Sequence, residues 1–275
     1  MKKTKRSPIF RRAAMAAAAL ALVAAAGCES VNTTQGGTIG IDRTQRMSSL
    51  VSEQQLDQQA VQLYQQTLSG ARGKGQLNTN ASQLARVRTI SQRLIGQVGV
   101  FRPDATKWKW EVNVIDDKEV NAWCMPGGKI AVYTGLINTV KPTDDELAAV
   151  LGHEIAHALR EHARERASEQ MATSMGLSVL AAITGSQASS DLGGALANVM
   201  FGLPNSRLHE TEADRMGVEL AARAGYDPRA AVTLWTKMGQ VGGSAPPEIL
   251  STHPSAESRI ADLRQASEKV LPLYQ

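Results

Sequence analysis

The sequence HEIAH at residues 153–157 limits what this chain can fold into more than any other feature. Residues four apart lie on the same face of an α-helix, so the imidazoles of His153 and His157 can reach one Zn²⁺ ion. Glu154 follows the first histidine, which lets its carboxylate take a proton from a water molecule. The motif therefore predicts a helix that carries two zinc ligands and a catalytic base. A pair of hydrogen-bonded core histidines is the alternative interpretation.

A tetrahedral zinc site needs a further protein ligand, and the sequence offers few. Besides the downstream acids, the candidates are His162, His209 and His253. Glu210 and Asp214 lie four residues apart where a second helix is expected to begin, so they share one of its faces. This geometry predicts Glu210 on zinc, with Asp214 holding the outer N–H of a ligand histidine.

Two other polar residues are expected to point away from the metal. Glu212 is rotated by about 200° from Glu210, so we expect it to be solvated or salt-bridged. His162 lies off the face of His153 by about 180°, and we expect it at the surface. His209 receives no role.

Apolar periodicity predicts a mostly helical α+β domain over residues 47–275, with a small antiparallel sheet. Thr143 and Glu146 have the spacing of a capping box, which predicts where the zinc helix begins. The expected strands cover residues 107–115, 120–125 and 130–133, and the expected earlier helices cover residues 47–68 and 80–95.

The first 27 residues have the order of a secretory signal: a basic stretch, fourteen apolar residues, and small residues before Cys28. Fourteen residues rise only about 21 Å as a helix, which disfavours a permanent transmembrane segment. The small residues before Cys28 resemble the bacterial lipoprotein box, which implies a lipid on Cys28 and attachment to a membrane. Ordinary cleavage near residues 24–26 is the alternative. Residues 28–46 are then expected to form a lipidated N-terminus and a flexible tether.

The formal net charge of +4 belongs to this leader. Residues 1–27 hold six basic residues and no acidic one, which leaves 24 basic and 26 acidic residues in the remainder. A domain that binds nucleic acid is expected to be basic itself. The composition therefore gives no reason to expect nucleic acid as a partner.

The HEIAH motif, the acidic segment that contains Glu210 and Asp214, and residues 121–130 together resemble the CAAX-prenyl-protease-type zinc metallopeptidases, a gluzincin group. The resemblance covers roughly residues 50–270 and is closest to the soluble periplasmic lipoprotein branch, related to the β-barrel-assembly-enhancing protease. It implies one zinc ion per chain on His153, His157 and Glu210. Glu154 would be the base and Asp214 the supporting catalytic acid.

The same resemblance points to two further parts of the site. The sequence around His253 is similar to a loop whose histidine can occupy the remaining zinc position, as a latch or fourth ligand. Stabilisation of an oxyanion and a plain surface position are the alternatives for His253. Residues Asn121, Ala122 and Trp123 resemble the strand beside the active site, which can pair with an extended substrate.

The function expected from these features is that of a zinc endopeptidase of the bacterial cell envelope, anchored by lipid, most consistent with the outer membrane. Its expected substrates are unfolded or misassembled envelope proteins, and the outer-membrane assembly machinery is a candidate partner. The alternative is a chaperone or scaffold lipoprotein that keeps a metal site with little turnover. Glu154 argues against this alternative, because metal binding alone does not require it.

Overall fold

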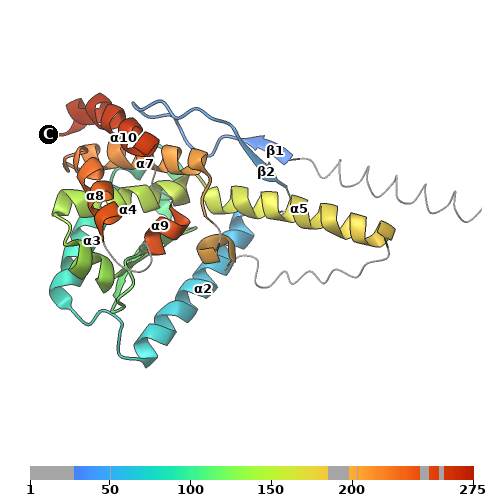
Figure 1. Ribbon diagram of the computed structural model, residues 1–275, viewed down its shortest axis with the longest axis horizontal. Coiled ribbons are helices and arrows are strands. Elements are labelled where there is room, and N and C mark those ends of the chain that lie inside the picture. The colour runs from blue at the N-terminus through green and yellow to red at the C-terminus, as the bar shows by residue number, and fades with distance from the viewer. Residues whose placement is uncertain (1–27, 50, 185–197, 203, 242–247, 254–256) are drawn as a thin grey trace, which may run out of the picture.

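The computed structural model describes residues 28–49, 51–184, 198–202, 204–241, 248–253 and 257–275 (Figure 1). The predicted signal peptide at residues 1–27 lies outside these ranges. For Cys28 the structure describes the backbone and not the side chain. None of the helices formed by the described residues is long and apolar enough to cross a membrane.

The domain is mostly helical, as the sequence predicts, with two small sheets. The helices are α2 (Glu53–Gly73), α3 (Ala81–Ile95), α4 (Asp144–Leu159), α5 (His162–Thr184), α7 (Arg207–Arg223), α8 (Ala230–Gln240), α9 (Glu248–Thr252) and α10 (Glu257–Val270). The strands are β1 (Cys28–Val31), β2 (Gln45–Ser48), β3 (Glu111–Ile115), β4 (Ala122–Met125) and β5 (Lys129–Tyr133). Short 3₁₀ or π segments cover Val98–Val100, Pro103–Lys107, Leu136–Val140, Asn198–Gly202 and Leu271–Leu273.

The larger sheet has the strand order β3-β5-β4, and the predicted hairpin forms its β4–β5 half. The sheet is mixed, because β3 pairs parallel with β5 where an antiparallel sheet was expected. Successive side chains of a strand point to opposite faces. Trp123 and Met125 accordingly pack with Tyr64 of α2, whereas Cys124 and Ile130 belong to the core that α3 and α4 share. The sheet thus lies between α2 and the helical core.

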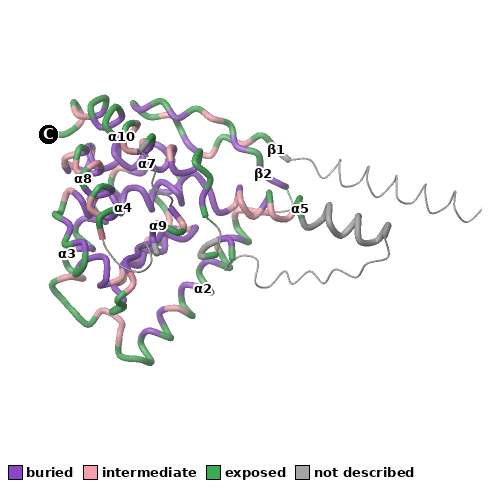
Figure 2. The backbone as a smooth tube through the Cα atoms, in the orientation of Figure 1, coloured by how far each residue is buried: buried purple, intermediate pink, exposed green. Residues whose placement is uncertain are grey.

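The buried helix α4 forms the centre of this core. It packs against α7, α8, α3 and β4, and it is buried along almost its whole length (Figure 2). Its start is fixed by the predicted capping box, in which Thr143 and Glu146 satisfy each other's backbone N–H groups. Its neighbour α7 begins after Ser206, whose hydroxyl accepts a hydrogen bond from the backbone N–H of His209. These two helices carry most of the residues that the sequence singled out.

The structure builds residues 28–46, the predicted flexible tether, into the domain. The two strands β1 and β2 form an antiparallel hairpin beside α5, and the chain between them runs over α7 (Figure 1). Ile39 and Ile41 are buried in the main core, and the carboxylate of Glu219 on α7 accepts the backbone N–H of Ile39 at 2.7 Å. The expected helix from residue 47 accordingly starts only at Glu53, because residues 45–48 form β2.

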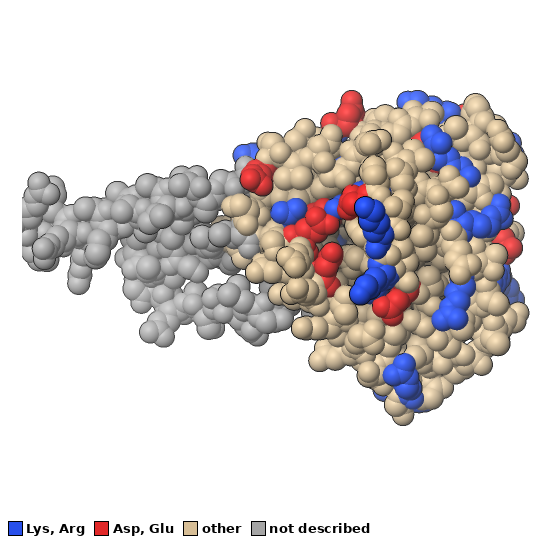
Figure 3. All heavy atoms as spheres, turned by 180° about the vertical axis from the view of Figure 1, so that it is seen from behind, with Lys and Arg blue, Asp and Glu red and all other residues tan. Residues whose placement is uncertain are grey.

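Charged side chains of both signs are scattered over one face of the molecule (Figure 3). On the face shown in Figure 3, lysine and arginine side chains lie among aspartate and glutamate side chains, and neither sign forms one continuous patch.

Candidate metal centre

Two neighbouring turns of α4 place His153 and His157 on one face, as the four-residue spacing predicts. Their Nε2 atoms are 3.0 Å apart, and both rings are buried. The Nδ1 atom of His153 lies 2.9 Å from Oδ1 of Asp214 on α7. Because a carboxylate accepts hydrogen bonds, this contact places a ring proton on Nδ1, and Nε2 is the ring atom that faces the other histidine.

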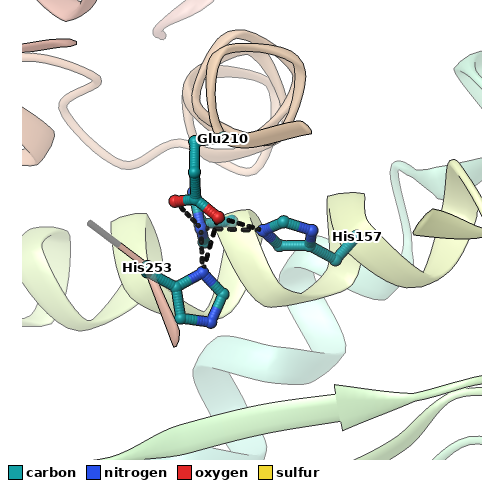
Figure 4. A group of neighbouring side chains, drawn as sticks. His157, Glu210 and His253 are labelled. Atoms are coloured by element: carbon teal, nitrogen blue, oxygen red, sulfur yellow. Dashed lines mark hydrogen bonds and ion pairs between the residues drawn. The ribbon is translucent and has the colours of Figure 1, made fainter. Parts of the chain in front are cut away.

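The carboxylate of Glu210 completes the group from α7. Its oxygens lie 3.4 Å from Nε2 of His153 and 3.3 Å from Nε2 of His157. Figure 4 shows the side chains of Glu210 and His157 pointing toward each other from their two helices. Asp214 is one helical turn further along α7, on the same face as Glu210. The structure therefore brings together the four residues for which the sequence predicts ligand or supporting roles.

His253 enters the same group from the end of α9. Its Nδ1 atom lies 2.9 Å from Oε1 of Glu210 and 3.1 Å from Nε2 of His153 (Figure 4). The side chain is buried, which contradicts the surface alternative for this histidine. Its Nε2 atom is 3.6 Å from Oε1 of Glu154, so it also borders the expected base.

The spacing of these donor atoms fits a divalent metal ion. Ligand atoms about 2.0–2.1 Å from a tetrahedral Zn²⁺ ion lie about 3.3 Å from one another. His153, His157, Glu210 and His253 each offer one ligand atom, all four residues are buried, and these atoms lie within 4.8 Å of one another. Three imidazole nitrogens and a carboxylate oxygen are also the donor types that zinc prefers.

The electrostatics of the group favour a cation at its centre. Burial opposes protonation of His153, but Glu210 and Asp214 outweigh it and raise the pKa of His153 to about 9. Burial alone would raise the pKa of Glu210, yet His253 and His153 hold it well below its ordinary value. Burial raises the pKa of Glu154, against the opposing effect of the same two histidines. Within the described residues, Glu154 Oε1 is buried and accepts no hydrogen bond.

Arg259 of α10 is a member of the group that no feature of the sequence marked. Its Nε and Nη2 atoms donate to the two oxygens of Asp214 at 2.5 and 2.8 Å. Nη1 also lies 2.7 Å from Oε2 of Glu210, and the guanidinium stacks 3.9 Å above the ring of Trp235. One planar cation thus holds both α7 carboxylates in place.

A second buried cluster lies behind His157, and it includes His162, for which the sequence predicted a surface position. His162 is fully buried, and its two ring nitrogens contact Nδ1 of His157 and Oε2 of Glu212. Burial lowers the pKa of His162 to about 3. The sequence predicted that Glu212 would be solvated or salt-bridged. It is salt-bridged to Arg160 and Arg43, and it is buried.

The remaining histidine belongs to the same cluster. His209 stacks on His162 with ring centroids 4.3 Å apart, and its Nε2 atom lies 3.1 Å from Glu165. It contributes no donor atom to the group of four that can hold a metal.

A cavity of about 280 Å³ opens beside the metal group. Its lining includes Glu154, His157 and His253, together with Asn121, Ala122 and Trp123. The last two belong to β4, which is an edge strand of the sheet within the described residues. The structure therefore places the expected substrate strand at the same cavity as the expected base.

These features define the class of the protein. Two packed helices carry a buried group of histidines and a glutamate, and a further glutamate lies beside an open cavity. This is the arrangement of a metallopeptidase. The family model for peptidase family M48 matches residues 81–267. The chain belongs to this family.

Several characterised proteins are similar to this chain. It is 41% identical over 167 residues to the mitochondrial metalloendopeptidase OMA1 of Arabidopsis thaliana, a match that covers 60% of this chain and 33% of the relative. It is 36% identical over 187 residues to the protein of the same name in Schizosaccharomyces pombe, covering 65% of this chain and 51% of the relative. The β-barrel assembly-enhancing protease of Escherichia coli (strain K12) is 28% identical over 212 residues, a match that covers 74% of this chain and 42% of the relative. The chain spans about a third to a half of the length of these relatives.

Proposed function

We propose that this chain is a zinc-dependent endopeptidase that cleaves unfolded or misassembled proteins of the cell envelope. The observation that carries the proposal is the convergence of His153, His157 and Glu210 beside Oε1 of Glu154, a buried atom that accepts no hydrogen bond from the described part of the chain. The metalloendopeptidases to which the chain is similar support it.

In this proposal, His153, His157 and Glu210 hold zinc, and His253 occupies or borders the remaining position. A zinc ion in such a group polarises a carbonyl oxygen and makes a nearby water molecule more acidic. Asp214 keeps the ring proton of His153 on Nδ1, and Arg259 keeps both α7 carboxylates in position. These residues therefore arrange the donor atoms before any substrate arrives.

Glu154 moves the proton in the proposed reaction. Its Oε1 atom takes a proton from the attacking water, and the same carboxyl passes it to the leaving amine of the cleaved peptide bond. The raised pKa of this buried carboxyl suits both steps, because it holds the proton more firmly than an exposed glutamate would. Glu154 lines the cavity, where a bound substrate would lie next to this atom.

The edge strand β4 is the proposed docking site for the substrate backbone. A sheet edge presents unpaired backbone groups, so an extended segment can add to it as a further strand. Such pairing recognises backbone more than side chains, which suits cleavage of unfolded chains at varied sequences. Folded proteins keep most of their extended segments paired within sheets, so they offer fewer of them.

The membrane anchor is part of the proposal. A lipid on Cys28 would hold the domain at a membrane, and the similarity to the β-barrel assembly-enhancing protease supports the outer membrane and its assembly machinery as the setting. Mass spectrometry of the membrane-extracted protein should find an acylated Cys28 at its N-terminus. An unmodified N-terminus at a neighbouring residue would contradict the anchor.

The test of the function is digestion of an outer-membrane β-barrel protein, offered unfolded in one reaction and folded in another. We expect cleavage of the unfolded form alone, loss of cleavage with a chelator, and recovery with added zinc. A chaperone without turnover would instead keep the unfolded form soluble and intact, and that result would contradict the proposal.

A further inference from the structure

His162 stands between the metal group and a buried carboxylate, although it contributes no atom to the metal group itself. Its Nδ1 atom lies 2.8 Å from Nδ1 of His157, and its Nε2 atom lies 3.0 Å from Oε2 of Glu212. The three side chains therefore form one line of hydrogen bonds that starts at Oε2 of Glu212 and ends at Nδ1 of His157.

This line has one consistent order of protons. The carboxylate of Glu212 only accepts, so Nε2 of His162 carries the hydrogen that it donates. A neutral ring then has a lone pair on Nδ1, and the contact of 2.8 Å with His157 requires the hydrogen to sit on Nδ1 of His157. Nε2 of His157 is thereby left without a hydrogen, and it faces Glu210 and His153.

The charges around Glu212 favour a neutral ring for His162 over a positively charged one. Arg160 donates to Oε1 of Glu212 at 3.0 Å, and Arg43 lies 2.7 Å from the same atom. Arg43 also binds Oε2 of Glu212 at 2.9 Å. Arg43 also binds Glu165, so the two guanidinium groups balance two carboxylates, and a further buried cation at His162 would have no carboxylate of its own.

The two histidines of the HEIAH motif are thus oriented by two carboxylates from the same helix. His153 contacts Asp214 directly, whereas His157 reaches Glu212 through the ring of His162. Glu212 and Asp214 lie on different faces of α7, which is why one of them needs an intervening ring.

We propose that His162 and Glu212 are positioning residues that fix the proton of His157 on Nδ1, so that its Nε2 atom offers a lone pair to the metal. The inference rests on the proposed function in one respect, that a metal ion is held by His157. Neither residue offers an atom to the metal group. The ring of His162 also borders the cavity beside that group. The contribution of Arg43 makes the N-terminal hairpin segment part of the same arrangement.

The first test needs no substitution. The chain has five histidines, so ¹⁵N-histidine labelling of the zinc-loaded protein gives a spectrum simple enough to assign. We expect His162 as the neutral ring with its hydrogen on Nε2, and His157 with a slowly exchanging hydrogen on Nδ1. A hydrogen on Nδ1 of His162, or a doubly protonated His162, would overturn the proposal.

The second test measures zinc affinity by competition with a chelator. Loss of a residue that orients a ligand histidine typically weakens metal binding about 10- to 100-fold, and we expect this for His162→Leu. His162→Asn should retain most of the affinity, because its side-chain oxygen can replace Nδ1 as the acceptor for His157. His209→Gln is the matched control, since this buried ring stacks on His162 without contributing a metal donor. Equal losses in the leucine and asparagine variants, or an equal loss in the control, would overturn the proposal.

These readouts separate the inference from the proposed function, because both follow protons and metal and neither follows cleavage. A protein with the expected ring protons and zinc affinities that cleaves nothing would contradict the proposed function alone. A protein that cleaves unfolded chains but whose His162→Leu variant binds zinc normally would contradict only the role of His162.

Discussion

Gly152 of α4 and Gly217 of α7 are in backbone contact, and this contact sets the distance between the helix of the histidines and the helix of Glu210. A Cβ atom on Gly152 would lie 2.8 Å from the carbonyl oxygen of Gly217. A Cβ atom on Gly217 would lie 2.8 Å from the backbone nitrogen of His153. Only glycine at both positions allows the two helices to approach this closely.

Gly217→Ala should therefore damage the metal group without changing any of its side chains. The added methyl group meets backbone, which cannot move aside as a flexible side chain can, so we expect a loss of about 1–3 kcal/mol in the free energy of unfolding. Zinc affinity should fall as well, because α7 carries Glu210 and Asp214 away from α4. Urea unfolding and chelator competition measure the two effects.

Gly70→Ala is the control for that substitution. Gly70 lies in α2, and a Cβ atom there would meet nothing within 4 Å. Alanine at an open helical position stabilises by about 0.5–1 kcal/mol, and zinc affinity should not change. Similar losses in both variants would show that the contact between α4 and α7 does not control the site.

Arg43→Gln should destabilise the domain, although Arg43 lies in a segment that the sequence predicts to be a tether. Its guanidinium binds Glu165 and Glu212 at 2.7–2.9 Å, so removal leaves two buried carboxylates without this partner. We expect a loss of about 1–3 kcal/mol in urea unfolding, as for other hydrogen bonds between charged groups. Arg46→Gln, at an exposed position of β2, should have little effect. Equal stability of the two variants would indicate that residues 28–48 do not hold the domain together.

Asp57 should make the stability of the domain fall with rising pH. Burial, together with the nearby carboxylates of Glu53 and Glu161, raises the pKa of Asp57 from its ordinary value of 3.8 to about 6. Because the folded state binds this proton more tightly than the unfolded state, stability is lost as pH rises from about 3.8 through 6. Asp57→Asn removes that loss, so it should be more stable than the wild type at pH 7.5 and no more stable at pH 3.5. A constant difference between the two proteins across this range would contradict the raised pKa.

His253→Ala tests the latch that the sequence suggested. Its Nδ1 atom lies among the donor atoms, where it would compete with the substrate for the open position of the metal. We expect the variant to keep zinc through the other three donors and to cleave unfolded protein several-fold faster. A large fall in rate with zinc retained would instead make His253 a stabiliser of the transition state, and the latch would be wrong.

The sequence predicted the centre of the fold and missed its surroundings, for identifiable reasons. The spacing of His153, His157 and Thr143 is local and carries its own geometry, so the zinc helix and its cap were predicted correctly. The prediction of a surface position for His162 was wrong, because it extended the periodicity of α4 to a residue that lies beyond the end of this helix. Glu161 has a φ of 51°, which ends α4 and lets α5 begin in a new direction.

Long-range contacts account for the other differences. Residues 28–46 have a polar composition typical of linkers, and their order depends on contacts with residues more than a hundred positions away, such as that of Arg43 with Glu212. Arg259 likewise has no local signature, since its role comes from the packing of α10 against α7. Such roles can be found only after the fold is known.

The most direct test of the account is the rate at which the zinc-loaded protein cleaves an unfolded polypeptide, compared with Glu154→Gln at equal zinc content. Removal of a general base typically costs about 10²- to 10⁴-fold in rate, and we expect a loss of that size. Zinc stoichiometry should be unchanged, because His153, His157 and Glu210 remain. Equal cleavage by the two proteins would contradict the assignment of Glu154, and the absence of cleavage by the wild type would contradict the proposed peptidase.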